Sequence, residues 1–183
     1  PPYNLSKDYR GYSDNLSYES YFDWCNRWLG QLVRVLKKGG VLFIVNIPLS
    51  SLEHFIFLNQ KLIFQNWIVW DALSAPVKRI LPAHYSVLFF TKGKKPKNFN
   101  YKENSSKNDS ICEPLDYQYC IRNSCVKKRD TDGINTKKQL TDLWTDIHRV
   151  KHNSLREDHP TLLPPKLMRR LITLFSKKDD LIL

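Results

Sequence analysis

The sequence predicts an α/β fold with a mostly parallel sheet and one antiparallel strand late in the chain. A stretch of helical periodicity, 18–36, is followed almost directly by a continuous apolar run, 41–45. Such a run is typical of a strand covered on both faces, as the strands of parallel sheets are. A second helix and two further strands are expected before residue 92. Helices and strands that alternate in this way indicate helices packed against a sheet.

The helix expected over 18–36 carries apolar residues three and four positions apart, which places them on one face. They are Phe22, Cys25, Trp28, Leu29, Leu32, Val35 and Leu36. Lys37 and Lys38 then supply cations to the last turn, and Gly39-Gly40 ends the helix. The sequence therefore predicts one amphipathic helix that leads through a glycine turn into the first buried strand.

The remaining elements follow from capping and composition. Ser50-x-x-Glu53 matches a capping box and predicts a helix from about 52 to 62. Residues 63–70 and 85–91 are rich in β-branched and aromatic side chains, which favours strands. A last helix opens at Pro164-Pro165, and its expected buried stripe is Leu167, Met168, Leu171, Ile172, Leu174 and Phe175. Residues 180–183 are expected to begin a buried strand.

The composition changes after residue 92, and the chain divides into three expected parts. Residues 94–139 are polar, basic and weakly periodic, which is typical of a loop region. They separate 1–93 from 140–183, where helical periodicity returns. At 183 residues the chain is long enough to bury one real core. It lacks an initiating Met, and we expect it to be a piece of a longer protein.

The charge predicts a polyanionic partner. The formal net charge is +11, and contacts to a phosphate backbone require Lys and Arg. Solvated lysines remain the alternative. The basic residues expected to contact phosphates lie in the middle region: Arg122, Lys127, Lys128, Arg129, Lys137 and Lys138. A charge run positions a protein on nucleic acid but does not read bases.

Composition also bears on the compartment. No apolar run approaches the roughly 20 residues that cross a membrane, so no membrane partner is expected. The chain opens with prolines and not with the pattern of a signal peptide. Four cysteines without a regular framework favour the cytoplasm. Cys112, Cys120 and Cys125 are either free thiols or, with His148 or His152, a zinc site; free thiols are preferred and no metal is assigned.

The chain begins with Pro1-Pro2-Tyr3-Asn4. Two rigid prolines form a stiff loop that offers carbonyl acceptors, with an aromatic ring beside them. This loop resembles the Asp/Asn/Ser-Pro-Pro-Tyr motif of amino-methylating DNA methyltransferases, which make N6-methyladenine or N4-methylcytosine. The first residue of that motif would precede Pro1, and Asp there would favour adenine while Ser would favour cytosine.

Three further segments match the same family in order. They are 37–44, 84–92, and 143–147 followed by His159-Pro160-Thr161 and Pro164. The arrangement resembles the permuted β-class, in which the catalytic half precedes the cofactor half. The resemblance implies a Rossmann-like methyltransferase fold that uses S-adenosylmethionine. It makes 1–93 the catalytic half, 94–139 the target-recognition region, and 140–183 the lead into a cofactor half whose binding loop lies beyond this chain.

The resemblance also implies the chemistry. Pro1, Pro2 and Tyr3 would form the catalytic site, where carbonyl acceptors activate the amine and Tyr3 stacks on a base flipped from the duplex. S-adenosylmethionine would lie near Asn4, His159, Pro160 and Thr161, with Asp142 and Trp144 as supports. Leu162 and Leu163 depart from the family pattern, which often has Gln and Lys there.

The expected activity is methylation of adenine N6 in double-stranded DNA within a restriction-modification system. Methylation of cytosine N4 is the near alternative, and a non-catalytic basic DNA-binding module is the other. The fragment alone is expected to be inactive. A cognate restriction endonuclease is an expected partner, although an orphan enzyme fits equally well. A monomer and a homodimer both remain open, in a bacterial or archaeal cytoplasm in association with the nucleoid.

Overall fold

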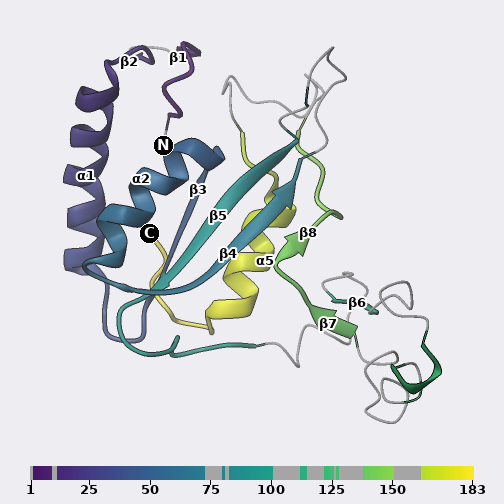
Figure 1. The fold of residues 1–183 in the computed structure, drawn as a ribbon. Helices are drawn as coiled ribbons and strands as arrows, with labels where there is room; N and C mark the ends of the chain where they lie inside the picture. The colour runs from purple at the N-terminus through teal and green to yellow at the C-terminus, as the bar shows by residue number, and fades with distance from the viewer. Residues whose placement is uncertain are drawn as a thin grey trace. The chain divides into compact units, whose positions relative to one another are not determined.

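Figure 1 shows the fold of the chain as a computed structural model. The structure describes residues 2–9, 12–72, 80, 83–100, 112–114, 122–125, 127, 138–150 and 162–183. The chain divides into two compact units. The first unit is Pro1–Phe99 with Leu143–Leu183, and the second unit is Asn100–Asp142.

The first unit is built on a sheet with the strand order β3-β5-β4-β8. Its strands are β3 (Val41–Asn46), β4 (Ile63–Asp71), β5 (His84–Thr91) and β8 (Leu143–Trp144). Strand β5 pairs antiparallel with both β3 and β4, while β4 and β8 are parallel. Three strands therefore share one direction and β5 opposes them, which confirms the α/β fold and the reversed late strand. Because β5 lies between β3 and β4, two of the three described pairings are antiparallel.

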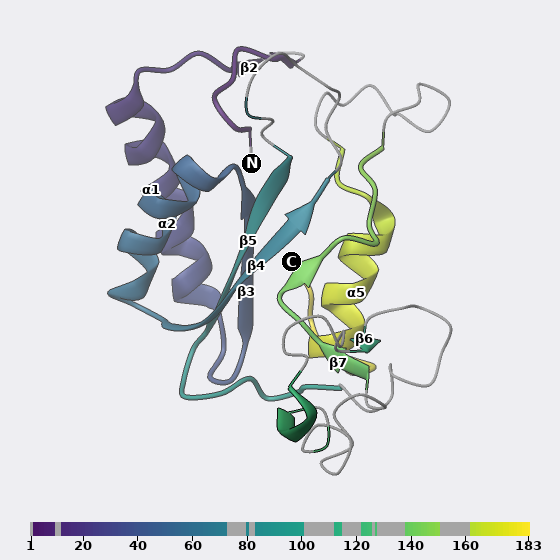
Figure 2. The ribbon, with the colours of Figure 1, turned by 45° about the vertical axis from the view of Figure 1, so that its right-hand side comes forward.

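Helices cover both faces of this sheet. Helices α1 (Tyr18–Val35) and α2 (Pro48–Asn59) lie on one face, and α5 (Pro165–Phe175) lies on the other, as Figures 1 and 2 both show. Helix α1 ends one residue before the predicted bound, and α5 begins at the second of the two prolines. The structure thus has the three layers that alternating elements predict.

Alternate residues of each strand feed two separate cores, because successive side chains point to opposite faces of a sheet. Ile44 and Leu88 pack among α1 and α2 residues, whereas Val45 and Val87 pack on the side of α5. The α1 and α2 core is Tyr21, Phe22, Cys25, Leu29, Ile44, Leu58, Leu62, Leu88 and Phe90. The α5 core is Val45, Ile68, Trp70, Ala72, Val87, Trp144, Ile147, Leu167 and Leu171.

Local interactions define both ends of helix α1. The hydroxyl of Ser17 caps it by accepting the backbone N–H of Ser20 at 3.2 Å. At the other end Gly39 has φ +77°, a left-handed conformation that side chains disfavour. This turn delivers the chain into β3 without a long connection.

The expected capping box of α2 is wrong. The helix begins at Pro48, with Ile47 as its N-cap and no side-chain cap. Proline is favoured at the first helical position because its ring already holds the helical φ and its missing N–H would have had no partner. Ser51 lies inside the helix and donates to the Ile47 carbonyl at 3.0 Å, while Glu53 accepts the hydroxyl of Tyr18.

Two expectations near the C-terminus need correction. Met168 and Ile172 on α5 are 41% and 37% exposed, whereas Arg170 is 4% exposed and occupies the inner face in their place. Residues 181–183 form no strand and are exposed. A strand requires a neighbour for its backbone groups, and none of the described strands pairs with them.

The remaining described elements are short. The hairpin of β1 (Asp8–Tyr9) and β2 (Tyr12–Ser13) follows the N-terminal loop. In the second unit, β6 (Cys112–Pro114) pairs antiparallel with β7 (Lys138–Leu140), within the region expected to be a loop. Of the helices that the structure describes, none has the length and apolar content that a bilayer crossing requires.

Candidate catalytic loop

Asp14 organises the backbone of the N-terminal loop. Its carboxylate accepts the backbone N–H groups of Asn4 at 2.9 Å and of Leu5 and Lys7 at 3.0 Å. Its own carbonyl accepts the N–H of Ser6 at 2.7 Å. Asp14 is 3% exposed, so these backbone donors meet an acceptor that water does not share. The loop is thereby wrapped around a single carboxylate.

Asn4 closes the loop a second time. Its backbone is left-handed, with φ 56°, a conformation that asparagine tolerates better than most residues. Its amide oxygen accepts the N–H of Leu16 and its amide nitrogen donates to the carbonyl of the same residue, both at 2.8 Å. The motif predicts Asn4 near the cofactor, and in the structure its amide holds the loop to the segment before α1.

Tyr21 connects the loop to α1. Its hydroxyl donates to the carbonyl of Pro2 at 2.7 Å, and its side chain is 1% exposed. Because Tyr21 is fixed in the core of α1, the carbonyl of Pro2 is held in one direction. The carbonyl of Pro2 therefore already has a hydrogen-bond donor.

A column of rings runs from the loop into the sheet. The ring of Tyr3 lies 5.8 Å from that of Tyr85, at the start of β5, and Tyr85 stacks on Trp70 of β4 at 5.3 Å. Tyr3 is 7% exposed. The loop therefore rests on an aromatic support at this end of β4 and β5.

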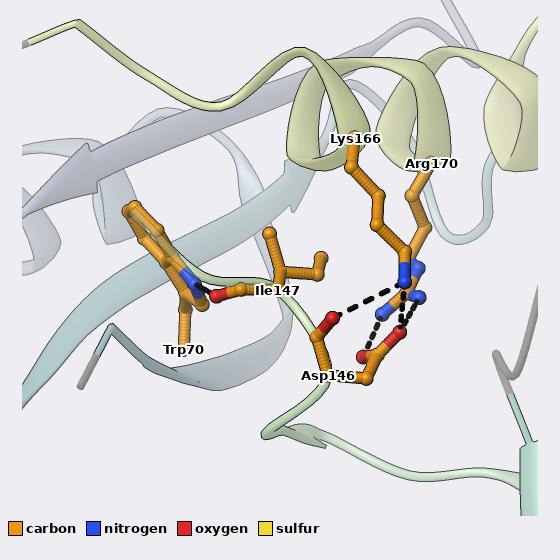
Figure 3. A network of polar contacts seen from close by, with 5 residues as sticks. All are labelled: Trp70, Asp146, Ile147, Lys166 and Arg170. Carbon is orange, nitrogen blue, oxygen red and sulfur yellow. Dashed lines mark hydrogen bonds and ion pairs between the residues drawn. The ribbon is translucent and has the colours of Figure 1, made fainter. Parts of the chain in front are cut away.

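The column continues into a polar network (Figure 3). The indole N–H of Trp70 donates to the carbonyl of Ile147 at 2.6 Å. Beside it the carboxylate of Asp146 binds Arg170 through both oxygens, at 2.9 and 2.5 Å, and Lys166 at 2.9 Å. Contacts from β4 to α5 thus fix the segment that follows β8.

The electrostatics of Asp146 reflect these partners. Burial by itself raises the pKa of the Asp146 carboxyl, but hydrogen bonds and positive charge from Arg170 and Lys166 outweigh it and lower the pKa to about 2. The guanidinium of Arg170 also lies over the ring of Trp144, 4.9 Å from its centroid. Trp144 is 3% exposed and belongs to the core, whereas Asp142 is exposed.

A buried histidine lies near the end of β3. His54 is fully buried, and its Nε2 is 3.1 Å from the amide nitrogen of Asn46. Burial lowers the pKa of the His54 imidazole to about 4, so the ring is neutral and Nε2 can accept from the amide. Among the described contacts its Nδ1 has no hydrogen-bond partner.

Several assigned residues lie outside the described part of the chain. They are Pro1, Cys120, Lys128, Arg129, Lys137, His152, His159, Pro160 and Thr161. Of the other basic residues, Arg122 and Lys127 are exposed in the second unit, and Lys138 lies in β7. Cys125 is present as a thiol, and the described residues include no metal-binding cluster of His, Cys, Asp or Glu. The zinc hypothesis therefore stays untested.

Sequence reasoning missed the residues that support the loop. Asp14, Tyr21 and Tyr85 contact it or its ring column, and none of them belongs to the predicted motifs as a site residue. Asp146 belongs to the predicted 143–147 motif, but nothing in the sequence pairs it with Arg170. The available signal is a polar or aromatic side chain within an otherwise apolar periodic stretch. Such a signal does not identify the residue that the side chain contacts.

A sheet of this strand order, with helices on both faces and one reversed strand, is the Rossmann-like fold of S-adenosylmethionine-dependent methyltransferases. The Pro1-Pro2-Tyr3 motif, of which Tyr3 lies at the end of this sheet beside Tyr85, is typical of the amino-methylating class. The chain belongs to the N6/N4 DNA methylase family, because the model of that family matches residues 1–183. This confirms the resemblance read from the motifs.

Curated relatives agree with this assignment. The chain is 37% identical over 188 residues to the type II methyltransferase M.BamHI of Bacillus amyloliquefaciens, covering all of this chain and 42% of that protein. It is 30% identical to the type II methyltransferase M.HpaI of Haemophilus parainfluenzae, covering 100% and 54%. It is 28% identical to the DNA adenine methyltransferase YhdJ of Escherichia coli K12, covering 100% and 61%. The chain thus spans about half the length of these relatives.

A solved structure supports the fold. TTHA0409 of Thermus thermophilus, provisionally assigned as a DNA modification methylase, matches with a TM-score of 0.50 and 20% identity. The match covers 87% of this chain and 60% of that one. At this identity the likeness bears on the architecture alone.

Proposed function

We propose that the whole protein transfers a methyl group from S-adenosylmethionine to N6 of adenine in duplex DNA, as part of a restriction-modification pair. Family membership supports methylation of DNA. The names of M.BamHI and M.HpaI support the type II setting, with a cognate restriction endonuclease as partner. The name of YhdJ supports adenine as the base.

The anchored N-terminal loop carries the proposal. An exocyclic amine is a poor nucleophile because its lone pair is delocalised into the ring. Acceptors that bind its two hydrogens favour a tetrahedral nitrogen and stabilise the positive charge that develops on methyl transfer. We assign one acceptor to the carbonyl of Pro1 and the other to the side chain before it. The carbonyl of Pro2 is less suited to this role because it already accepts the hydroxyl of Tyr21 at 2.7 Å.

Rigidity is what such a site requires. Acceptors stabilise a transition state best when they are already oriented and need no reorganisation. Asp14 binds three N–H groups of the loop, and Asn4 and Tyr21 attach it at two further points. These contacts support a loop whose carbonyls are held in place before the substrate arrives.

The target base must leave the duplex to reach this loop. Tyr3 is the proposed stacking partner for the flipped adenine. Because its ring is only 7% exposed and lies against Tyr85, stacking requires a local rearrangement of the loop when DNA binds. The column of rings beneath it would then serve as the support for the stacked base.

S-adenosylmethionine would supply a methyl group that its sulfonium already activates. Of the residues assigned to it, His159, Pro160 and Thr161 lie outside the described residues, and Asn4 uses most of its amide on Leu16. Asn4 can still donate its second amide hydrogen. Its proposed role is therefore to support the loop beside the cofactor, with at most one direct hydrogen bond.

Transfer of label tests the proposal. The full-length protein would be incubated with tritiated S-adenosylmethionine and mixed-sequence duplex DNA. We expect label in the DNA, and a loss of about a hundredfold in rate for Tyr3→Ala from the lost stacking and support. Tyr18→Ala, which removes a half-exposed ring outside the loop, serves as the control. Folded protein that binds DNA without labelling it would favour the non-catalytic module.

A further inference from the structure

Three loops meet at the end of the sheet opposite the catalytic loop. They are 36–40 between α1 and β3, 92–98 after β5, and 176–180 after α5. Figures 1 and 2 both show these loops together at the lower end of the sheet, away from the N-terminus. All three belong to the first unit.

Backbone hydrogen bonds join the first two loops. Gly39 donates to the carbonyl of Lys92 at 2.7 Å, and Lys92 donates to that of Gly40 at 3.0 Å. Lys97 then donates to the carbonyl of Gly39 at 2.8 Å. These backbone hydrogen bonds therefore continue the pairing of β3 and β5 as a short ladder, before the start of β3 and after the end of β5.

Asp180 attaches the third loop. Its carboxylate accepts the amide of Asn98 at 2.7 Å and the backbone N–H of Lys177 at 2.9 Å, and it pairs with Lys97 at 3.5 Å. Asn98 is 8% exposed. A mostly buried amide thus holds the third loop against the second.

Two glycines permit this close approach. Gly39 has φ +77°, and a Cβ there would come within 3.1 Å of the Cβ of Lys97. Gly93 has φ +119°, which side-chain-bearing residues rarely adopt. The three loops therefore pack into one continuous surface, which we call the platform, and are not three independent surface segments.

The platform is strongly positive. Its exposed lysines, which we call the basic edge, are Lys37, Lys38, Lys94, Lys95, Lys97, Lys177 and Lys178. The acidic residues of the same loops are Asp179 and Asp180, and Asp180 is committed to the contacts above. Within the described residues, Lys97 is the member of the basic edge with a recorded ion pair.

We propose that the basic edge binds the phosphate backbone of DNA at a second place, separate from the catalytic loop. Tyr85, which contacts Tyr3, is seven residues from Lys92 along β5, and at about 3.3 Å per residue the two ends lie roughly 23 Å apart. The inference rests on the proposed function only in taking DNA as the partner. It adds a contact surface that the catalytic reaction itself does not need.

The chemistry of the basic edge favours phosphate over an acidic protein. Lysine is a strongly hydrated point charge that suits phosphate oxygens. Lysine is depleted at protein interfaces, where aromatic anchors are enriched. The three loops contain no aromatic residue, and the exposed aromatic residue beside them is Phe99, directly after the second loop. Because lysines contact phosphates without reading bases, binding here would be independent of sequence.

The salt dependence of binding tests the proposal. The full-length protein and its Lys94→Gln/Lys95→Gln variant would bind a fluorescent duplex lacking any preferred site, between about 50 and 200 mM salt. We expect the slope of log affinity against log salt to fall by about 2, close to 0.9 for each lost phosphate contact. Arg27→Gln/Arg169→Gln removes the same charge from exposed helix positions away from the basic edge and should change the slope less than half as much.

Equal slopes for the two variants would overturn the proposal. So would a variant that keeps its DNA slope but loses binding to polyglutamate, since that outcome assigns the surface to an acidic protein. Methyl transfer by the wild-type protein is measured separately. If the Lys94→Gln/Lys95→Gln variant shows the reduced salt slope but the wild-type protein never labels DNA, this inference stands and the proposed function is wrong.

Discussion

The hydroxyl of Tyr21 donates a hydrogen bond of 2.7 Å to the carbonyl oxygen of Pro2. The two residues are 19 positions apart, and the bond joins the N-terminal loop, the candidate catalytic loop, to the buried face of α1. Because α1 packs on the sheet through the same face, the orientation of the loop depends on the core of the domain.

Removing this hydroxyl should impair catalysis more than stability. Tyr21→Phe keeps the ring in the core and leaves the carbonyl of Pro2 without this donor. We expect a loss of about 1 kcal/mol in the free energy of unfolding. We also expect kcat to fall about tenfold, with KM for DNA and for S-adenosylmethionine nearly unchanged. Steady-state methylation of duplex DNA and urea unfolding measure the two effects.

Tyr18→Phe provides the matched control on the same helix. Its hydroxyl donates to Glu53 on α2 and not to the loop. If both variants lowered kcat equally, the effect would belong to α1 as a whole and the positioning role of Tyr21 would be wrong.

Asp14→Asn should loosen the loop. In the wild-type protein the two carboxylate oxygens of Asp14 accept three backbone N–H groups. An asparagine has one side-chain oxygen, and its NH₂ group would face at least one of these N–H donors. A buried donor without a partner costs about 1–3 kcal/mol, which unfolding curves would show. Asp23→Asn, at an exposed position of α1, should change stability by less than 0.5 kcal/mol or so. Equal losses would contradict the account of Asp14.

His54 should make stability depend on pH. Its pKa is about 4 in the folded chain and 6.5 in the reference state, chiefly because burial disfavours the cation. The unfolded chain therefore binds the proton first as pH falls, so stability is unaffected above about pH 6.5 and declines toward pH 4. The full effect is about 3 kcal/mol, measurable as unfolding free energy between these pH values.

Two variants isolate that histidine. His54→Gln removes the buried titrating group and should flatten the profile between pH 4 and 6.5, whatever its effect on stability at pH 7. His84→Gln, at an exposed position of β5, should keep the wild-type profile. An unchanged slope in His54→Gln would assign the pH dependence to other groups.

Asp146→Asn should destabilise the α5 side of the sheet. The substitution leaves the guanidinium of Arg170, whose side chain is 3% exposed, without a carboxylate. Breaking a buried pair from one side costs about 3 kcal/mol. The wild-type contribution should be present above about pH 4 and be lost as pH falls toward 2, because the partners of Asp146 depress its pKa. Asp142→Asn, at an exposed position, is the control in denaturant unfolding; equal losses would contradict this.

Periodicity was sufficient for most of the fold. The helical spacing over 18–36 and the apolar run over 41–45 identify their own elements, because each buries most of the face that its pattern reveals. Val35, predicted on that face, is 44% exposed at the last residue of α1. The start of α2 was misplaced because Pro48 and Ser50 both signal a helix N-terminus, and the proline prevailed. Residues 181–183 are apolar enough for a strand, but a strand also depends on a partner that its own residues do not reveal.

The site was predictable only in part. Pro2 and Tyr3 were recognisable from their motif, but Asp14 and Tyr21 act through contacts that no spacing rule predicts. The pairing of Asp146 with Arg170 spans 24 positions and places an arginine where periodicity favours apolar residues. The basic residues of the middle region form runs that the sequence shows directly, whereas the basic edge is assembled from loops that are far apart in the sequence.

We propose that the full-length protein methylates the exocyclic amine of adenine. The most direct measurement is nucleoside mass spectrometry of duplex DNA after reaction with the protein and S-adenosylmethionine. We expect N6-methyladenine, formed more slowly by Tyr21→Phe. N4-methylcytosine would contradict the choice of base, and unmodified DNA from folded protein would contradict the enzymatic function itself.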